Sequence, residues 1–138
     1  MKAGLRVTMM LAVAVAAAAL VAAGCGSSSK PAYCSKVSDL QSSLNSLKNV
    51  QFNSNTISTV RTDVQKVQTN ANAVVSSAKQ DFPNQTSALE SSVSTLSTSI
   101  QALPAAPTRE QLLPIAPQIA STVSAADSLK SATDSACN

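Results

Sequence analysis

The chain has 138 residues, of which 44% are hydrophobic, 12% charged and 2% aromatic, and its formal net charge is +3. This length fits one domain. The absence of histidine excludes an ordinary zinc site, a Ser-His or Cys-His nucleophile pair, and an imidazole acid or base near neutral pH. We therefore expect no catalytic residues, no metal site, no cofactor and no enzymatic activity.

The N-terminal segment has the layout of a signal peptide. Lys2 and Arg6 precede an uncharged apolar run over residues 7–23 that ends in small residues. This run is a little shorter than the roughly 20 residues that cross a bilayer as a helix, and no basic cluster follows it. The pattern predicts export from the cytoplasm.

The end of this run, LVAAGC over residues 20–25, resembles the lipobox of bacterial lipoproteins. The resemblance covers residues 1–25 and implies that residues 1–24 are removed as a lipoprotein signal peptide. Cys25 then carries the lipid and holds the protein on the extracytoplasmic face of the cell membrane. Two or more acyl chains give a stable anchor, whereas one chain binds only marginally. The alternatives are an ordinary secretory signal cut near Ala23 and an uncleaved anchor.

Loss of the signal also changes the charge. Removing Lys2 and Arg6 lowers the basic residues from ten to eight against seven acidic ones, a net charge of about +1. The remaining cations are dispersed, and no aromatic residues alternate with them to stack on bases. We expect no nucleic-acid partner and interpret these cations as a solvated surface: Lys30, Lys36, Lys48, Arg61, Lys66, Lys79, Arg109 and Lys130.

If Cys25 carries lipid, two cysteines remain near the ends of the mature chain. Pairing is expected in an oxidising compartment, so we predict a disulfide between Cys34 and Cys137. Free thiols and an intermolecular pair are the alternatives. The serine-rich stretch that follows Cys25 predicts a flexible tether over residues 25–32, with the folded domain over residues 33–138.

Within this domain the apolar residues recur in steps of three and four, which predicts four helices. The first three helices cover about residues 35–50, 56–80 and 85–103, and the fourth contains the last set of apolar residues, from Ile119 to Ala136. Each predicted helix is apolar on one face only, as in helices packed on one another. The expected core positions are Val37, Leu40, Leu44, Leu47, Ile57, Val60, Val64, Val67, Ala71, Val74, Ala78, Leu89, Val93, Leu96, Ile100, Leu103, Ile119, Val123, Ala126, Leu129, Ala132 and Ala136.

Turn-rich breaks over residues 51–55, 81–84 and 104–107 separate the helices, and their lengths suit antiparallel neighbours. Residues 87–90 and 108–111 both fit the capping box of a helix N-terminus, although the first match conflicts with a helix that starts at Asn84 or Gln85. Pro114 and Pro117 cannot both lie inside a regular helix. Residues 108–113 therefore form either a separate short turn or the kinked start of the last helix.

The predicted disulfide tests the number of helices, because bonded cysteines need Cα atoms within about 7 Å. An even number of up-down helices returns the C-terminus to its starting end, whereas three would leave the termini roughly 30 Å apart. The sequence therefore predicts an all-α fold, an up-down antiparallel four-helix bundle closed by one disulfide.

The Ala- and Ser-rich composition and short serine tether are similar to those of small lipoproteins of high-GC Gram-positive bacteria. This resemblance implies an interaction or structural module that meets another envelope protein or a wall polymer. The alternative is a carrier of a small apolar ligand, for which small side chains of the second and fourth helices would leave room. The predicted apolar core positions include no polar residue that could hold a ligand between the helices, which favours the interaction module.

Ser-x-x-Lys matches at residues 27–30 and 76–79 lack the partner motifs of penicillin-recognising enzymes.

Overall fold

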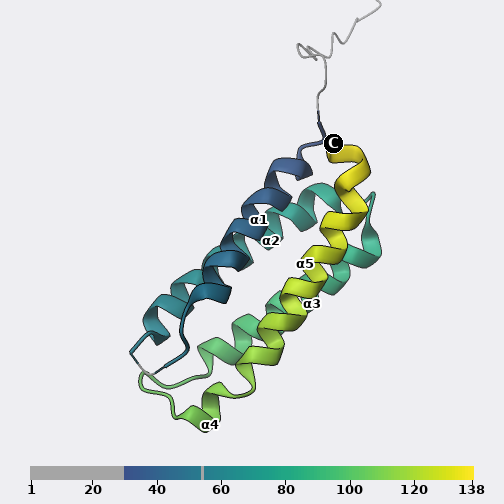
Figure 1. The fold of residues 1–138 in the computed structure, drawn as a ribbon. Coiled ribbons are helices and arrows are strands. Elements are labelled where there is room, and N and C mark those ends of the chain that lie inside the picture. Colours follow the sequence, from purple (N-terminus) through teal and green to yellow (C-terminus); the bar gives the residue numbers. More distant parts are fainter. Residues whose placement is uncertain (1–29, 54) are drawn as a thin grey trace, which may run out of the picture.

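The computed structural model describes residues 30–53 and 55–138, and the regular structure in these ranges is entirely helical. The helices are α1 (Tyr33–Asn49), α2 (Ile57–Ala78), α3 (Pro83–Gln101), α4 (Arg109–Leu112) and α5 (Ile115–Cys137). Four of them are long and form the predicted antiparallel bundle (Figure 1). The ends of the first three helices differ from the expected ones by only one or two residues.

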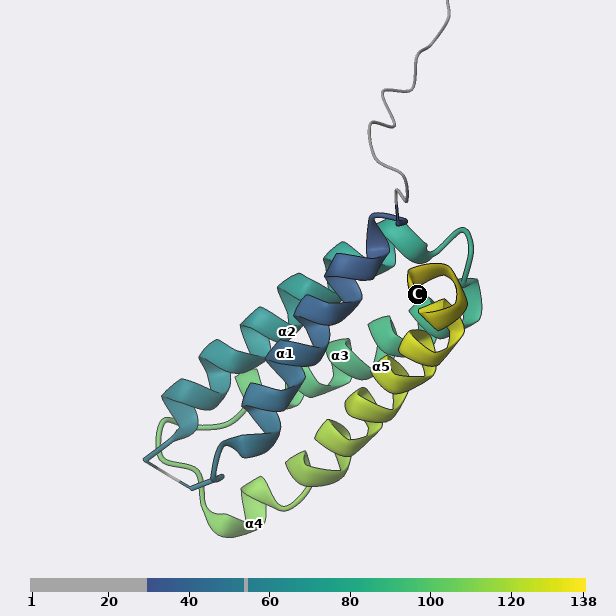
Figure 2. The same ribbon diagram turned by 45° about the horizontal axis from the view of Figure 1, so that its top comes forward.

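The four long helices are arranged as a square (Figure 2). Each contacts the helix before and after it around the ring, from α1 to α2, α3 and α5 and back to α1. Among the described residues, the contact between α1 and α5 is the least extensive of these four. The seam between α1 and α5 is therefore the most open side of the bundle.

The apolar stripes of α1, α2 and α3 form the core as predicted. Every expected residue of α1 and α2 is buried, and so are the expected residues that lie within α3. Leu103 differs because α3 ends at Gln101, so this residue lies in the following loop and is only half-buried. Strict helical spacing on these segments allows one face of each to be removed from water along its whole length.

The buried face of α5 departs from the prediction. Half of the expected positions are buried: Ile119, Ala126 and Leu129. The others are only partly buried: Val123, Ala132 and Ala136. Thr122 and Thr133 complete the seam, with exposed fractions of 0% and 1%. Their hydroxyls donate to carbonyls of their own helix, Gln118 and Lys130, each at 2.9 Å, which offsets the cost of burying a polar group. The expectation of a seam without polar residues was wrong.

The segment before α5 is a separate short helix. Thr108 caps α4 with a capping box, in which its side chain accepts from the backbone of Gln111 and the Gln111 side chain accepts from the backbone of Thr108. Pro114 precedes α5 and Pro117 lies in its first turn, where backbone N–H groups have no partner within the helix. The other match to the capping box, at residues 87–90, does not cap a helix, because Ser87 lies inside α3, which starts at Pro83.

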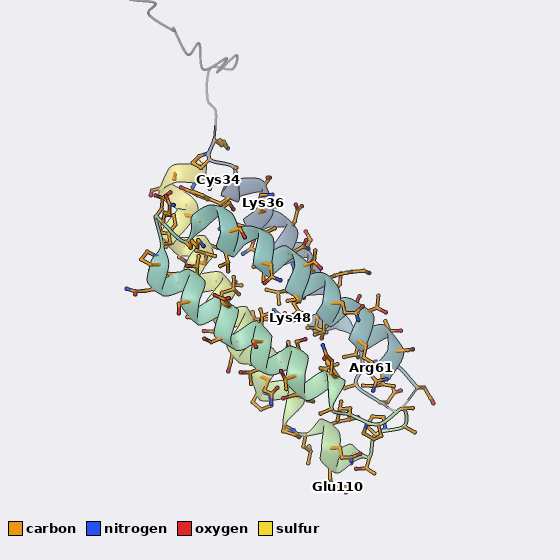
Figure 3. All side chains as sticks on the ribbon, turned by 180° about the vertical axis from the view of Figure 1, so that it is seen from behind. Cys34, Lys36, Lys48, Arg61 and Glu110 are labelled. Carbon is orange, nitrogen blue, oxygen red and sulfur yellow. A yellow bond between two sulfur atoms is a disulfide. The ribbon has the colours of Figure 1, made fainter. Side chains whose placement is uncertain are left out.

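The predicted disulfide is present and closes one end of the bundle. Cys34 and Cys137 are separated by 103 positions in the sequence, and their Cα atoms lie 5.6 Å apart. Tyr33, next to the bridge, packs edge-on against Phe82 in the α2–α3 turn with ring centroids 5.6 Å apart. Figure 3 shows Cys34 at this end and Glu110 of α4 at the opposite end. Both termini of the domain are thus fixed at the same end of the bundle, the end where the described structure begins at residue 30.

Polar side chains also link neighbouring helices. The Arg61 guanidinium of α2 donates to the carbonyl oxygen of Leu103 and, at 3.4 Å, to that of Pro104. Asn70 of α2 donates to the Ser43 hydroxyl of α1. Arg61 is half-buried, so its interpretation as part of a solvated surface was wrong: its guanidinium holds the loop that follows α3.

Candidate functional site: a groove between α1 and α5

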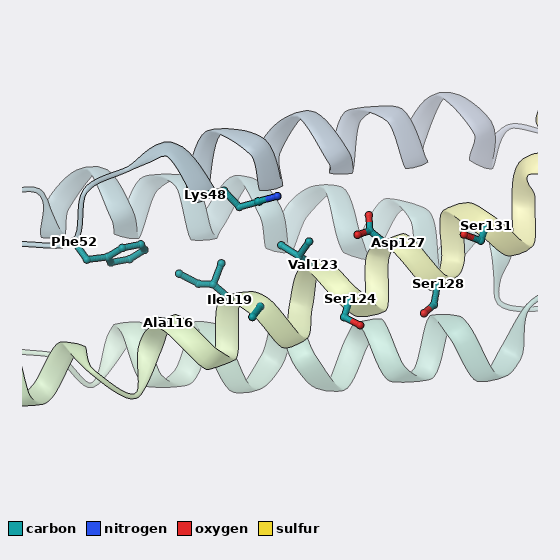
Figure 4. A pocket seen from close by; sticks show the side chains of 10 residues that line it. Lys48, Phe52, Ala116, Ile119, Val123, Ser124, Asp127, Ser128 and Ser131 are labelled. Atoms are coloured by element: carbon teal, nitrogen blue, oxygen red, sulfur yellow. The ribbon is translucent and has the colours of Figure 1, made fainter.

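A groove of about 900 Å³ runs along the open seam between α1 and α5 (Figure 4). Most of its lining comes from one face of α5, with Lys48 from the last turn of α1 and Phe52 from the α1–α2 loop. The volume lies near the upper end of the range typical of ligand-binding pockets, about 300–1,000 Å³. The α5 lining consists of Ala116, Ile119, Ala120, Val123, Ser124, Asp127, Ser128 and Ser131.

The groove exists because α5 carries small side chains on this face. Ala116, Ala120, Ser124 and Ser128 follow one another at intervals of four residues, so they form one row on the helix surface. All four are exposed. Three of them, Ala120, Ser124 and Ser128, also line a hollow of about 630 Å³ between α5 and α3, so the row leaves space on both sides of α5.

Phe52 closes one end of the groove, and the loop that carries it is held by its own side chains. The Thr56 hydroxyl donates to the carbonyl oxygens of Gln51 and, at 3.1 Å, of Asn53. The Asn53 side chain in turn accepts from the backbone N–H of Asn55 at 2.9 Å. These bonds give the loop a defined path, and Phe52 packs half-buried against the core.

The lining changes from apolar to polar along the groove. Phe52, Ala116, Ile119 and Val123 form the end nearer α4, and Ser128 and Ser131 lie toward the disulfide. Two charged groups lie between these ends, the ammonium of Lys48 and the carboxylate of Asp127. The ion pairs among the described residues are Lys66 with Asp63 and Lys130 with Asp134. Neither Lys48 nor Asp127 belongs to one of these ion pairs.

The apolar end of the groove continues into a second hollow of about 470 Å³ at the α4 end of the bundle. Phe52 and Ala116 line both hollows, and Leu112 and Leu113 line the second. Leu113 is 64% exposed, the one large apolar side chain among the described residues that is so open to solvent. Asn53 and Arg109 also line the second hollow. A largely apolar surface therefore extends from Val123 to the end of the bundle farthest from the disulfide.

The residues singled out from the sequence do not meet at this groove. Cys34 and Cys137 form the disulfide, whereas Cys25 and the serine of the 27–30 match lie outside the described residues. Ser76 and Lys79 of the other match are both exposed near the end of α2. Within the described ranges, no group of three Cys, Asp or Glu side chains is placed to hold a metal ion.

Sequence reasoning missed the groove because its two sides are more than 60 positions apart in the chain. Of the small residues expected on the fourth helix, Val123 lines the groove, whereas Ala126 is packed in the core. The small residues of the second helix were a misleading signal of free space, because Ala71 and Ala78 of α2 are fully packed in the core. Only the position of α1 shows that Lys48 lies across from Val123.

Comparison with protein-family models, curated protein sequences and solved structures found no match to this chain. None of the described helices combines the length and the apolar character that a bilayer span requires.

Proposed function

We propose that this protein is a lipid-anchored, extracytoplasmic helical module that acts by contact with another protein or a wall polymer of the cell envelope. Cys25 carries the lipid and residues 26–32 are the tether. The α1/α5 groove and the apolar surface beyond it form the contact site.

The observation that carries this proposal is the separation of the two ends of the domain. Residues 30–32, the described part of the proposed tether, lie beside the Cys34–Cys137 bridge, and the apolar surface lies at the opposite end, beside α4. A 23-residue helix such as α5 is about 35 Å long. The contact surface is therefore directed away from the membrane that holds the lipid, toward components of the envelope.

The anchor is tested by mass spectrometry of the mature N-terminus and by fractionation of a Cys25→Ala variant. We expect an N-terminal peptide that begins at Cys25 with a diacylglycerol, and loss of the variant from the membrane fraction. An unmodified N-terminal peptide that begins at another residue would refute the anchor.

The contact surface is tested by photo-crosslinking in intact cells. A photoreactive residue at Ser124, in the groove, is expected to capture a defined envelope component. The matched position Ser94, exposed on α3, is the control. The same capture from both positions would contradict a contact site in the groove. Cys25→Ala in the Ser124 background is expected to lose the adduct, because the domain leaves the membrane surface.

A second candidate, a carrier of a small ligand, is favoured by the volume and the apolar end of the groove. We expect labelled single-chain lipids to bind the wild-type protein, and a Val123→Trp substitution to weaken binding at least about tenfold by filling the groove. Ser94→Trp, with the same side chain on α3, is expected to bind normally. Circular dichroism of both variants separates loss of the groove from loss of the fold.

A further inference from the structure

We propose that the α1/α5 groove binds a single-chain zwitterionic amphiphile whose anionic group is next to the chain and whose cationic group lies beyond it. This inference rests on the carrier function, the second candidate above. It adds the chemical class of the ligand and the direction in which it lies.

The chemical groups along the groove follow a fixed order. The apolar stretch from Ala116 to Val123 covers eight residues of α5, about 10 Å along the helix axis. Figure 4 shows the Lys48 side chain extending from α1 over the part of α5 between Ile119 and Val123. Asp127 lies one helical turn beyond Val123, on the side away from Phe52. The order is therefore apolar surface, ammonium and then carboxylate.

Both charged groups can bind a ligand. Lys48 has three donor hydrogens, and Asp127 presents two acceptor oxygens. Neither joins the ion pairs found among the described residues, Lys66–Asp63 and Lys130–Asp134. Ser131, one helical turn beyond Asp127, adds an exposed hydroxyl group. A head group in this part of the groove thus meets one cation, one anion and a neutral hydroxyl group.

The order of apolar surface, ammonium and carboxylate along the groove favours a complementary order of chain, anionic group and cationic group in the ligand. With the chain on Phe52 and Val123, the part of the head group next to the chain lies at Lys48, where an anionic group is attracted. The part beyond it lies at Asp127, which attracts a cation. A head group with the reverse order would bring like charges together at both positions. A longer chain continues past Phe52 onto the apolar surface of Leu112 and Leu113.

Two detergents with the same chain and opposite head groups test this order. Dodecylphosphocholine has the phosphate next to the chain, and dodecyl sulfobetaine has the ammonium there. Binding to residues 25–138 with Cys25→Ala, which include every described helix, is measured by calorimetry below the micelle concentration. We expect dodecylphosphocholine to bind at least about tenfold more tightly.

Substitutions at the charged positions then test the residues. Lys48→Gln is expected to weaken dodecylphosphocholine binding about tenfold. Lys79→Gln removes a lysine from the end of α2, outside the groove, and is expected to have no effect. The double substitution Lys48→Asp and Asp127→Lys reverses the charges and is expected to reverse the preference in favour of the sulfobetaine.

Each other outcome has a defined meaning. Equal binding of the two detergents, or a preference that the double substitution leaves unchanged, overturns the proposed ligand order and leaves the carrier function in place. Failure of both detergents to bind overturns the ligand class and the carrier function together. The envelope-contact function depends on its own crosslinking experiment and is unaffected by that result.

Discussion

Arg61 shows how a single side chain can stabilise a segment that has little core of its own. The loop between α3 and α4 is mostly exposed, and the guanidinium binds the carbonyl oxygens of Leu103 and Pro104 within it. Because Arg61 is fixed on α2, these bonds connect the loop to a helix distant in sequence. A cation that looks solvated in the sequence thus has a structural role.

We expect Arg61→Met, which keeps most of the aliphatic stem, to lower the free energy of unfolding by about 1–2 kcal/mol, since hydrogen bonds from a charged donor are lost. Urea unfolding followed by circular dichroism measures the change. Arg109→Met, at an exposed position on α4, is the control and is expected to change stability by less than about 0.5 kcal/mol. Equal effects of the two substitutions would contradict the role of Arg61.

At the scale of elements, helix starts are decided by what precedes them. Residues 87–90 and 108–111 fit the same capping-box pattern, yet only Thr108 lies at a helix N-terminus. The difference comes from Pro83, whose fixed φ and missing N–H suit the first turn of α3. The helix therefore starts four residues before Ser87, which becomes an interior, exposed residue.

We expect alanine substitutions in the two capping-box matches to have different effects. Thr108→Ala removes the cap of α4 and is expected to cost about 1 kcal/mol and to speed amide hydrogen exchange over residues 109–113. Ser87→Ala is expected to be neutral or slightly stabilising, because alanine is the better interior helix former. Hydrogen exchange measured by NMR tests both. Faster exchange at the start of α3 in the Ser87 variant would contradict the observed helix start.

At the scale of the whole molecule, the square arrangement explains both the disulfide and the groove. Four antiparallel helices return the C-terminus beside the N-terminus, which allows the bridge between residues 103 positions apart. The same closure makes α1 and α5 neighbours. The bundle thus has one covalently fixed end, and its least extensively packed side lies between α1 and α5.

Reduction of the disulfide is expected to lower the melting temperature strongly. In the chain-entropy model a closed loop of about 100 residues contributes up to about 4.7 kcal/mol. Thermal unfolding with and without excess reductant measures this contribution. The variant with Cys34→Ala and Cys137→Ala is the control, and its melting temperature is expected to be insensitive to reductant. A wild-type melting temperature that reductant leaves unchanged would contradict the stabilising role of the bridge.

The sequence by itself determined the helical class, the number of long helices, their approximate ends and the pairing of Cys34 with Cys137. These features depend on local spacing, on turn-forming residues and on the geometric limits of a bridge. The tertiary structure decided which polar residues are buried, as at Thr122 and Thr133, and which side of the bundle is left open. Those features depend on how neighbouring helices are rotated against each other, and that rotation is set by contacts between segments far apart in the chain.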